Sequence, residues 1–315
     1  MKLTVTRGFS AVRSRPHPVA TIGNFDGHHR GHRALLETVV QTARNAHGTA
    51  LVLTFDPHPV RVLAPQVDLR FLTSPEEKLS HFEAAGIDEV VFLEFTPALA
   101  GMSPEAFVED ILCRRLRIAE IFVGEHFAFG KGRAGRIADL VGFGAKFGFT
   151  VHAVQPVTWE GGVVSSTRIR QLIQAGRLVE AASLLGRAYA ITGTVIPGRQ
   201  QGQSLGWPTA NIRIPPDRVI PPDGVYAAQA ICEGATYDAI AYIGTRPTFG
   251  PGERLIEVNL LNQQRDLYSK DVSVEFIERL RGDHTFASAE ELSAQISRDV
   301  EQARQSLRRF VLGVR

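Results

Sequence analysis

The sequence is poor in cysteine and has no long apolar run. Cys113 and Cys232 are its two cysteines in 315 residues, too few for a disulfide scaffold or a Cys-rich zinc site. Both lie in apolar stretches, and we expect buried thiols. No apolar run approaches the roughly 18 residues that a membrane-spanning helix needs, and the segment 1–16 lacks the apolar core of a signal peptide. These absences predict a cytoplasmic protein with no membrane partner.

A strong excess of charge is also missing. The 35 basic and 33 acidic residues leave a formal net charge of +2, which is too even for a general nucleic-acid binder. We therefore expect no nucleic-acid partner. Hydrophobic residues make up 44% and charged residues 22% of the chain, close to the averages for folded globular proteins, so disorder and a simple coiled coil are excluded. The oligomeric state stays open.

The length predicts two domains, at roughly 100 to 200 residues for each. Nine of the ten histidines precede residue 187, which suggests that the two parts perform different chemistry. From residue 18 to about 186, strand-like runs alternate with helical patterns, which predicts an α/β domain with a parallel sheet. Such a sheet binds ligands outside the carboxyl ends of its strands. We place this first domain at residues 1–186.

From residue 187 to 315 the pattern changes to short strands separated by Gly and Pro. This pattern predicts a compact antiparallel β-barrel. The last stretch has helical spacing, and we expect its apolar stripe to pack on the barrel. The stripe consists of Leu292, Ile296, Val300 and Leu307.

The strongest motif is GNFDGHHRGHRALL, residues 23–36, a glycine-containing turn between a strand and a helix. Backbone N–H groups and the helix N-terminus favour an anion there. His29 and His32 would project from the same side of the helix, and Gly31 between them leaves room for a phosphate. Two histidines at this spacing are by themselves more often a solvated helix start. The residues just ahead reverse that expectation, and they are Gly23, Phe25, Asp26 and Gly27. We interpret the neighbouring His28 as a bystander.

A second motif, VSSTRIR at 164–170, places hydroxyl groups at the expected start of a helix. Ser166 and Thr167, the helix N–H groups and the Arg170 guanidinium together suit a triphosphate. Taken alone, a plain helix cap with surface arginines explains this segment about as well. The segment indicates a triphosphate site only in combination with the histidine motif.

Together these segments resemble the HxGH nucleotidyltransferases, with His29 and His32 as the two histidines. TFDPHPV at 54–60 and VGEHFAFGKGRAG at 123–135 resemble further signatures of the bacterial bifunctional riboflavin kinase/FMN adenylyltransferases, also called FAD synthetases. The resemblance implies a Rossmann-like nucleotidyltransferase domain at the N-terminus. One departure stands out, because family members often carry Asn where this chain has His126.

The C-terminal half resembles the riboflavin kinases independently. The segment 191–212, ITGTVIPGRQQGQSLGWPTANI, is similar to their nucleotide-binding loop, in which Gly198, Gly202 and Gly206 would let the chain wrap around phosphate oxygens. Thr209 and Asn211 offer hard oxygen ligands that suit Mg²⁺. A Gly-rich barrel hairpin is the alternative. Further segments follow in the family's order, so the resemblance spans nearly the whole chain.

A carboxylate inside the apolar strand RLIEVNLL also needs an explanation. Burying Glu257 without a partner would cost several kcal/mol, and the resemblance implies that it is the base of the kinase reaction. A solvent-facing position on an alternating strand remains the alternative. Arg279 and Arg281 are candidates for holding an anionic product, although exposed arginines at a strand end are commoner than ligands.

The resemblance implies two reactions that use ATP as co-substrate: riboflavin is phosphorylated to FMN, and FMN is adenylylated to FAD with release of pyrophosphate. The flavin ring favours apolar and aromatic walls, although isolated phenylalanines are often core residues. Our candidates for flavin contact in the first domain are Phe55, Pro57, Pro59, Phe127 and Phe129. Two alternatives remain: a nucleotidyltransferase for another phosphate-bearing substrate with the barrel as a platform, and a non-catalytic binding module.

Overall fold

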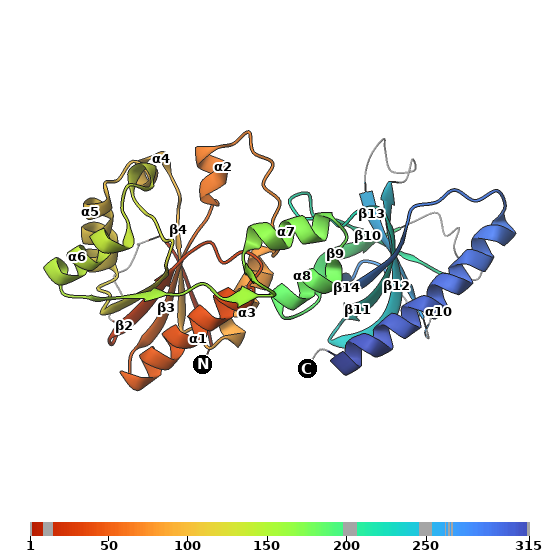
Figure 1. Cartoon of the computed structure of the whole chain (residues 1–315), viewed down its shortest axis with the longest axis horizontal. Coiled ribbons are helices and arrows are strands. Elements are labelled where there is room, and N and C mark those ends of the chain that lie inside the picture. Colours follow the sequence, from red (N-terminus) through yellow and green to blue (C-terminus); the bar gives the residue numbers. More distant parts are fainter. Residues whose placement is uncertain are drawn as a thin grey trace. The chain divides into compact units, whose positions relative to one another are not determined.

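The computed structural model describes residues 2–8, 15–197, 207–245, 254–261, 263, 265 and 267–313. It consists of two compact units, divided between Ser165 and Ser166 (Figure 1). This division differs from the domain boundary predicted after residue 186, because the segment 166–186 groups with the barrel. The division of activities at residue 186 stays a prediction.

A parallel sheet forms the centre of the first unit. In the described residues its strand order is β1-β4-β3-β2-β5-β6, and every neighbouring pair is parallel. The predicted α/β architecture is therefore confirmed, although the sequence did not reveal β1. The strands are β1 (Thr4–Arg7), β2 (Pro18–Ile22), β3 (Thr49–Phe55), β4 (Glu89–Leu93), β5 (Glu120–Gly124) and β6 (Thr150–Val154).

Helices cover both faces of this sheet. On one face, α1 (Arg30–Asn45) and α3 (Pro75–Ala84) contribute Leu36, Val39 and Phe82 to an apolar core. On the other, α5 (Pro104–Phe107), the π-helix η1 (Val108–Arg115) and α6 (Ile137–Phe147) pack against the strands. Shorter elements complete the unit: α2 (Pro59–Leu63), α4 (Pro97–Ala100), the 3₁₀ turn η2 (Lys131–Arg133) and the hairpin β7 (Thr158–Trp159) with β8 (Gly162–Val163).

The order of the strands fixes where a ligand can bind. From β2 the chain moves to β3 and β4 on one side, then returns to β5 and β6 on the other side. The carboxyl ends of β2 and β5 therefore flank a topological switch point, the usual ligand crevice of an open α/β sheet. The predicted phosphate-binding turn, residues 23–29, connects the carboxyl end of β2 to α1 at this point.

The second unit begins with two short helices, α7 (Ser166–Gln174) and α8 (Leu178–Leu185). Gly176 and Gly186 follow them with φ of +74° and +70°, the left-handed conformation in which a glycine commonly ends a helix. The unit continues as a closed barrel in the order β10-β13-β12-β11-β14-β9. Its antiparallel strands are β9 (Tyr189–Ile196), β10 (Ala210–Arg213), β11 (Gly224–Cys232), β12 (Ala235–Thr245), β13 (Arg254–Leu260) and β14 (Asp271–Gly282).

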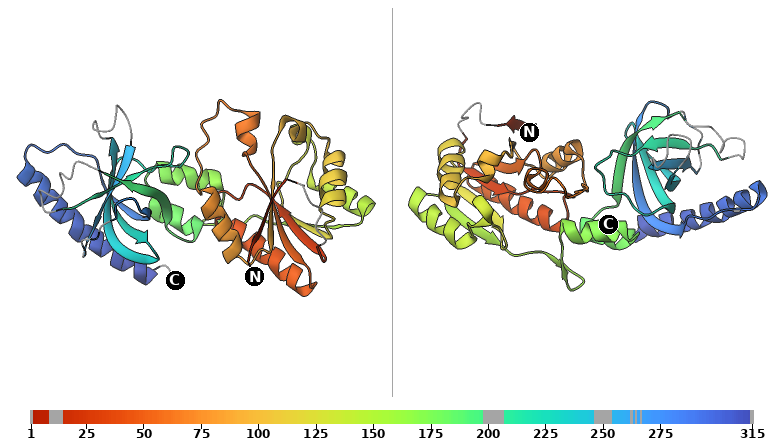
Figure 2. Two further views of the ribbon diagram at one scale, coloured as in Figure 1. Left: turned by 180° about the vertical axis from the view of Figure 1, so that it is seen from behind. Right: turned by 90° about the horizontal axis from the view of Figure 1, so that it is seen from above.

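The helix α10 (Ala289–Gly313) packs along the outside of the barrel, as Figure 2 shows. Ile296, Val300 and Leu307 of the predicted stripe join the apolar clusters between this helix and the strands. The two cysteines behave differently from each other. Cys232 is buried as expected, whereas Cys113 is only partly buried, because it lies at the edge of the core around η1.

Candidate active sites

The turn after β2 brings the two histidines of the first motif together. His29 caps α1, and its Nδ1 accepts a hydrogen bond of 3.3 Å from the backbone N–H of His32. The two imidazole rings stack with their centroids 3.6 Å apart. Gly31 allows this arrangement, because a Cβ there would lie 3.2 Å from the His29 ring. The spacing predicted this pairing at the start of the helix.

The surroundings of His32 disfavour the charged form of its imidazole. Burial lowers the pKa of His32 well below its ordinary value, and the charges of His29, His28 and Lys78 lower it further. Its Nδ1 is buried without a hydrogen-bond partner among the described residues. An imidazole in its neutral form can still donate one hydrogen bond to a phosphate oxygen. A buried polar atom without a partner is typical of a site that a ligand completes.

Asp26 and Gly27 anchor the turn to residues 72 and 73 through hydrogen bonds. The buried Asp26 carboxylate accepts hydrogen bonds from the backbone N–H of Leu72 at 3.0 Å and from the N–H and hydroxyl of Thr73, each at 3.1 Å. The Gly27 N–H donates to the Thr73 hydroxyl, also at 3.1 Å. Local sequence patterns do not indicate this role for Thr73, because the contact joins segments 46 residues apart. These bonds position the turn.

Phe25 and His28 support the turn through ring contacts. Phe25 is buried and lies edge-on to His32 at 5.2 Å and to Phe82 at 5.5 Å. His28 stacks on His81 of α3 at 4.7 Å. This contact joins the turn to α3. Gly23, at the end of β2, fits against the Phe25 ring, because a Cβ there would lie 3.2 Å from it.

The second predicted motif is divided between the units: residues 166–170 belong to the second unit, and Val164 and Ser165 belong to the first. Ser166 is the first residue of α7, Thr167 is exposed and Arg170 is half-buried one turn further on. The histidine pair and these residues thus belong to separately described units. A shared triphosphate site therefore stays a prediction.

The predicted flavin contacts divide into core and partly exposed groups. Phe129 is a buried core residue that contacts the Phe107 ring at 6.0 Å. Phe127 stacks on Phe129 at 5.5 Å and keeps part of its surface accessible. Phe55, at the end of β3, is also partly exposed and meets Phe95 edge-on at 5.4 Å. Phe55 and Phe127 are therefore the better candidates for contact with a flat ring.

The remaining residues of these two signatures lie near the ends of β3 and β5. Pro57 is exposed and follows a cis peptide bond, and Pro59 is the first residue of α2. His126, where the family pattern is broken, is exposed in the turn after β5. The structure assigns these residues no contact with the histidine pair.

In the barrel, Glu257 lies directly opposite Asn211. The two residues are register partners on the antiparallel strands β13 and β10, so their side chains share one face at roughly 5 Å between Cβ atoms. They alternate with the fully buried Ile212 and Ile256, and therefore face the outside of the barrel. Thr209 lies two residues before Asn211. The half-buried Glu257 is thus neither a core carboxylate nor a fully exposed one.

A buried amide holds the segment that carries Thr209. The Asn259 side chain, 5% exposed, donates a hydrogen bond of 2.7 Å to the carbonyl of Pro208. Trp207 packs into the apolar cluster beneath α10. Sequence reasoning missed Asn259, although its position two residues after Glu257 on the same strand face could have indicated it. Gly198, Gly202 and Gly206 lie outside the described residues.

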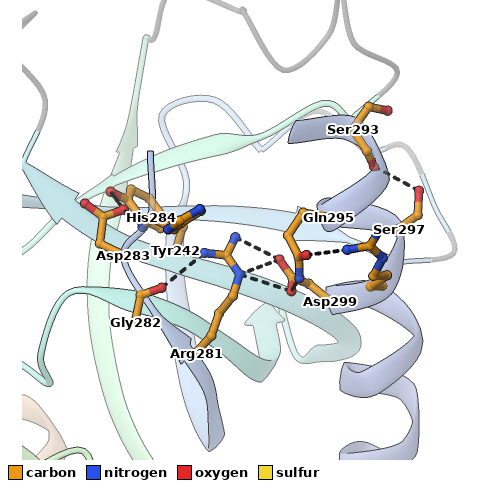
Figure 3. A network of polar contacts seen from close by, with 10 residues as sticks. Tyr242, Arg281, Gly282, Asp283, His284, Ser293, Gln295, Ser297 and Asp299 are labelled. Carbon is orange, nitrogen blue, oxygen red and sulfur yellow. Dashed lines mark hydrogen bonds and ion pairs between the residues drawn. The ribbon is translucent and has the colours of Figure 1, made fainter. Parts of the chain in front are cut away.

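The two arginines of β14 have different environments. The Arg279 Nη2 donates to the backbone carbonyl of Asp223 at 2.8 Å, while its Nε is buried without a partner among the described residues. Arg281 instead forms an ion pair of 2.9 Å with Asp299 of α10, as Figure 3 shows. The side chain of Asp299 is 3% exposed. Arg281 is therefore a link between strand and helix, which makes it a poor candidate for binding a product.

The donor groups of the kinase half fit a hard cation. In the described part of the chain, no three His, Cys, Asp or Glu residues gather as a metal site. The Thr209 hydroxyl and the Asn211 amide oxygen are oxygen donors, and Mg²⁺ commonly takes few protein ligands and completes its shell with phosphates and water. The residues present are compatible with Mg²⁺ held together with a nucleotide.

Comparison with known proteins decides between the alternatives. The FAD synthetase family matches residues 12–168, and the riboflavin kinase family matches residues 185–307. The bifunctional riboflavin kinase/FMN adenylyltransferase of Escherichia coli (strain K12) is 37% identical over 96% of this chain and 97% of its own length. This chain belongs to that bifunctional family. The family's enzyme from Pseudomonas fluorescens is 38% identical over 91% of this chain and 92% of its own length.

The fold of the family is also present in a solved structure. A protein from Streptococcus pneumoniae, named a macrolide-efflux protein, matches with a TM-score of 0.87 and 29% identity, over 96% of this chain and 98% of its own. Its name refers to a different activity, and its likeness to this chain is one of fold and sequence. None of the helices in the described residues is both long enough and apolar enough to cross a membrane.

Proposed function

We propose that the barrel phosphorylates riboflavin to FMN with ATP, and that the histidine turn adenylylates FMN to FAD and releases pyrophosphate. The observation that carries this proposal is the register of the barrel, which sets the Glu257 carboxylate directly across from Asn211 and beside the Thr209 segment. A carboxylate and an amide oxygen thus lie together on one strand pair, and the Thr209 hydroxyl is one residue before β10. Both family matches support the same two activities.

In the kinase step, Glu257 takes the proton of the riboflavin 5′-hydroxyl. The hydroxyl oxygen forms a bond to the γ-phosphorus, the bond between that phosphorus and the β–γ bridging oxygen breaks, and ADP leaves. Thr209 and Asn211 would hold Mg²⁺ through their oxygen atoms, and Asn259 keeps Thr209 in place through Pro208. Bound Mg²⁺ would neutralise charge on the transferred phosphoryl group. Arg279 stays a candidate for the flavin phosphate.

In the adenylyl step, the FMN phosphate attacks the α-phosphorus of ATP, and the bond to the β-phosphate breaks. The nucleophile is already ionised, because a phosphate monoester has a second pKa of about 6, so no base is needed. His32 and His29 donate hydrogen bonds to phosphate oxygens at the N-terminus of α1, whose N–H groups favour the same anion. Ser166, Thr167 and Arg170 are proposed to hold the triphosphate.

A cytoplasmic location belongs to the same proposal. Cys113 and Cys232 are both free thiols, which suits a reducing compartment. ATP as co-substrate suits it as well.

The full chain incubated with riboflavin, ATP and Mg²⁺ tests the proposal by product chromatography. FMN is expected first and FAD after it, and chelation of the metal with EDTA should stop FMN formation. FAD from supplied FMN without any FMN from riboflavin would mean that the barrel is only a platform. Absence of both products together with intact ATP would favour a binding module.

A further inference from the structure

One face of α3 lies against the histidine turn. His81 stacks on His28 at 4.7 Å, and Phe82 meets Phe25 at 5.5 Å. Lys78 precedes these two residues by one helical turn, so all three side chains lie on the same side of α3. The bonds from Asp26 to Leu72 and Thr73 fix the start of this helix relative to the turn. Lys78 is thus directed toward the turn by packing on both sides of it.

Lys78 interacts electrostatically with His32. The Lys78 ammonium is one of the groups that lower the pKa of His32, which places it within electrostatic range of that ring. Burial lowers the pKa of Lys78 itself, while Asp26 and Asp56 raise it through space without a hydrogen bond. Asp26 follows β2 and Asp56 follows β3, so both carboxylates lie beyond the carboxyl ends of these strands.

Both nearby carboxylates are engaged elsewhere. Asp26 receives its hydrogen bonds from Leu72 and Thr73. Asp56 forms an ion pair of 2.8 Å with Arg7. Among the described residues, the half-buried ammonium has no ion pair of its own. Partly desolvating a cation without a direct counterion costs free energy, and such positions concentrate at functional sites.

The reaction proposed for this turn brings two anions together, a triphosphate and the FMN phosphate. An ammonium on a flexible stem is a common phosphate ligand that acts as a point charge. Burial disfavours the charged form of His32, and the Lys78 ammonium can supply positive charge beside it. We infer that Lys78 binds a phosphate group of the adenylyl-transfer reactants next to His32. This inference rests on the proposed function of the turn.

The test uses the full chain and Lys78→Met, which keeps the length of the side chain and removes its charge. Lys78→Arg retains the charge, and Lys146→Met removes an exposed lysine that pairs with Glu105 in the same unit. We expect Lys78→Met to lower kcat/KM for FAD formation about 100-fold, in the range for loss of one charge-stabilising group. Lys78→Arg should recover at least a tenth of the wild-type value, and Lys146→Met should match the wild type.

Separate titrations of the two substrates distinguish the phosphates. A rise in KM for ATP alone assigns Lys78 to the triphosphate, and a rise for FMN alone assigns it to the flavin phosphate. A fall in kcat with both KM values unchanged assigns it to the transition state. Each of these outcomes supports phosphate binding by Lys78.

Two controls distinguish the loss of a phosphate ligand from a loss of folding, and the failure of this inference from the failure of the proposed function. Riboflavin phosphorylation by Lys78→Met should stay within twofold of the wild type, and its unfolding temperature should not fall, because the substitution removes a desolvated charge. FAD formation by Lys78→Met equal to that of Lys146→Met would overturn the inference, as would an activity loss matched by lower thermal stability. A wild-type chain that makes no FAD would instead refute the function proposed for the turn.

Discussion

At the scale of single residues, the turn between β2 and α1 depends on a glycine. Gly27 adopts φ of +86°, and a Cβ there would lie 2.6 Å from Cδ1 of Leu72. Leu72 is held by the same Asp26 carboxylate that anchors the turn. The backbone conformation and the close approach therefore both exclude a larger residue.

We predict that Gly27→Ala lowers the free energy of unfolding by about 1–3 kcal/mol, the usual cost of a non-glycine residue in a disfavoured backbone region. Urea unfolding followed by circular dichroism measures it. Gly142→Ala is the control, because Gly142 lies inside α6 with open space around its Cα. That substitution should be neutral or stabilising. Equal stability of the two variants would show that the turn tolerates a side chain.

Some residue contacts could be predicted from the sequence, and others could not. The pairing of His29 and His32 depends only on helical spacing, and it was predicted. The anchoring role of Asp26 depends on Thr73, 47 residues away, and the engagement of Arg281 depends on Asp299. Such partners become visible only when the chain has folded, because local spacing carries no information about them.

At the scale of elements, one ion pair attaches α10 to the barrel. Arg281 at the end of β14 meets Asp299 through several hydrogen bonds, and Gln295 donates to the same carboxylate at 2.8 Å (Figure 3). The Arg281 side chain is 23% exposed, so water screens part of this interaction.

Asp299→Ala should lower the free energy of unfolding by about 2–4 kcal/mol, because it leaves a half-buried guanidinium without its counterion. Glu301→Ala, on the exposed side of the same helix, removes a loose pair with Arg304 at 3.9 Å and should cost about 0–0.5 kcal/mol. Thermal unfolding of both variants provides the comparison. A loss from Asp299→Ala no larger than that from Glu301→Ala would contradict this account of the helix.

A second link joins neighbouring strands of the sheet. Glu120, at the start of β5, bonds the Nε2 atoms of His17 at 2.9 Å and of His152 in β6 at 2.7 Å. The hydrogen bond with His17 is the largest cause that lowers the pKa of Glu120 below its ordinary value of 4.5. A carboxyl group with a depressed folded pKa stabilises the fold above its unfolded pKa. That stabilisation is lost as the pH falls through the folded value.

We therefore predict that Glu120→Gln is less stable than the wild type by about 1 kcal/mol at pH 7. The difference should shrink as the pH falls below about 4.5, near the unfolded pKa of a glutamate. Denaturant unfolding between pH 7 and pH 3 measures it, with Glu125→Gln as an exposed control. A difference that stays constant over this range would rule out the carboxylate as its source.

Elements with strong patterns were predicted well, and weak ones were not. The apolar stripe of Ile296, Val300 and Leu307 follows from helical spacing, and it packs on the barrel as predicted. β1 has only four residues with alternating exposure, so its pattern gave no signal on its own. The π-helix η1 continues α5, and its wider turn depends on packing against the sheet.

At the scale of the whole molecule, two compact units place two chemistries in one chain. The first unit offers two stacked imidazoles and a helix N-terminus, which suit a nucleophile that is already ionised. The barrel offers a carboxylate opposite an amide, which suits the activation of a neutral alcohol. The change in composition near residue 187 predicted this division, whereas the grouping of α7 and α8 with the barrel depends on tertiary contacts that the sequence does not show.

Product chromatography of two single variants tests this division most directly. His32→Ala should reduce FAD formation at least 100-fold and leave FMN formation within twofold of the wild type, since loss of one transition-state donor costs about 10²–10³ in rate. Glu257→Gln should reduce FMN formation from riboflavin by a similar factor and leave FAD formation from supplied FMN intact. Loss of both products in either folded variant would contradict separate sites.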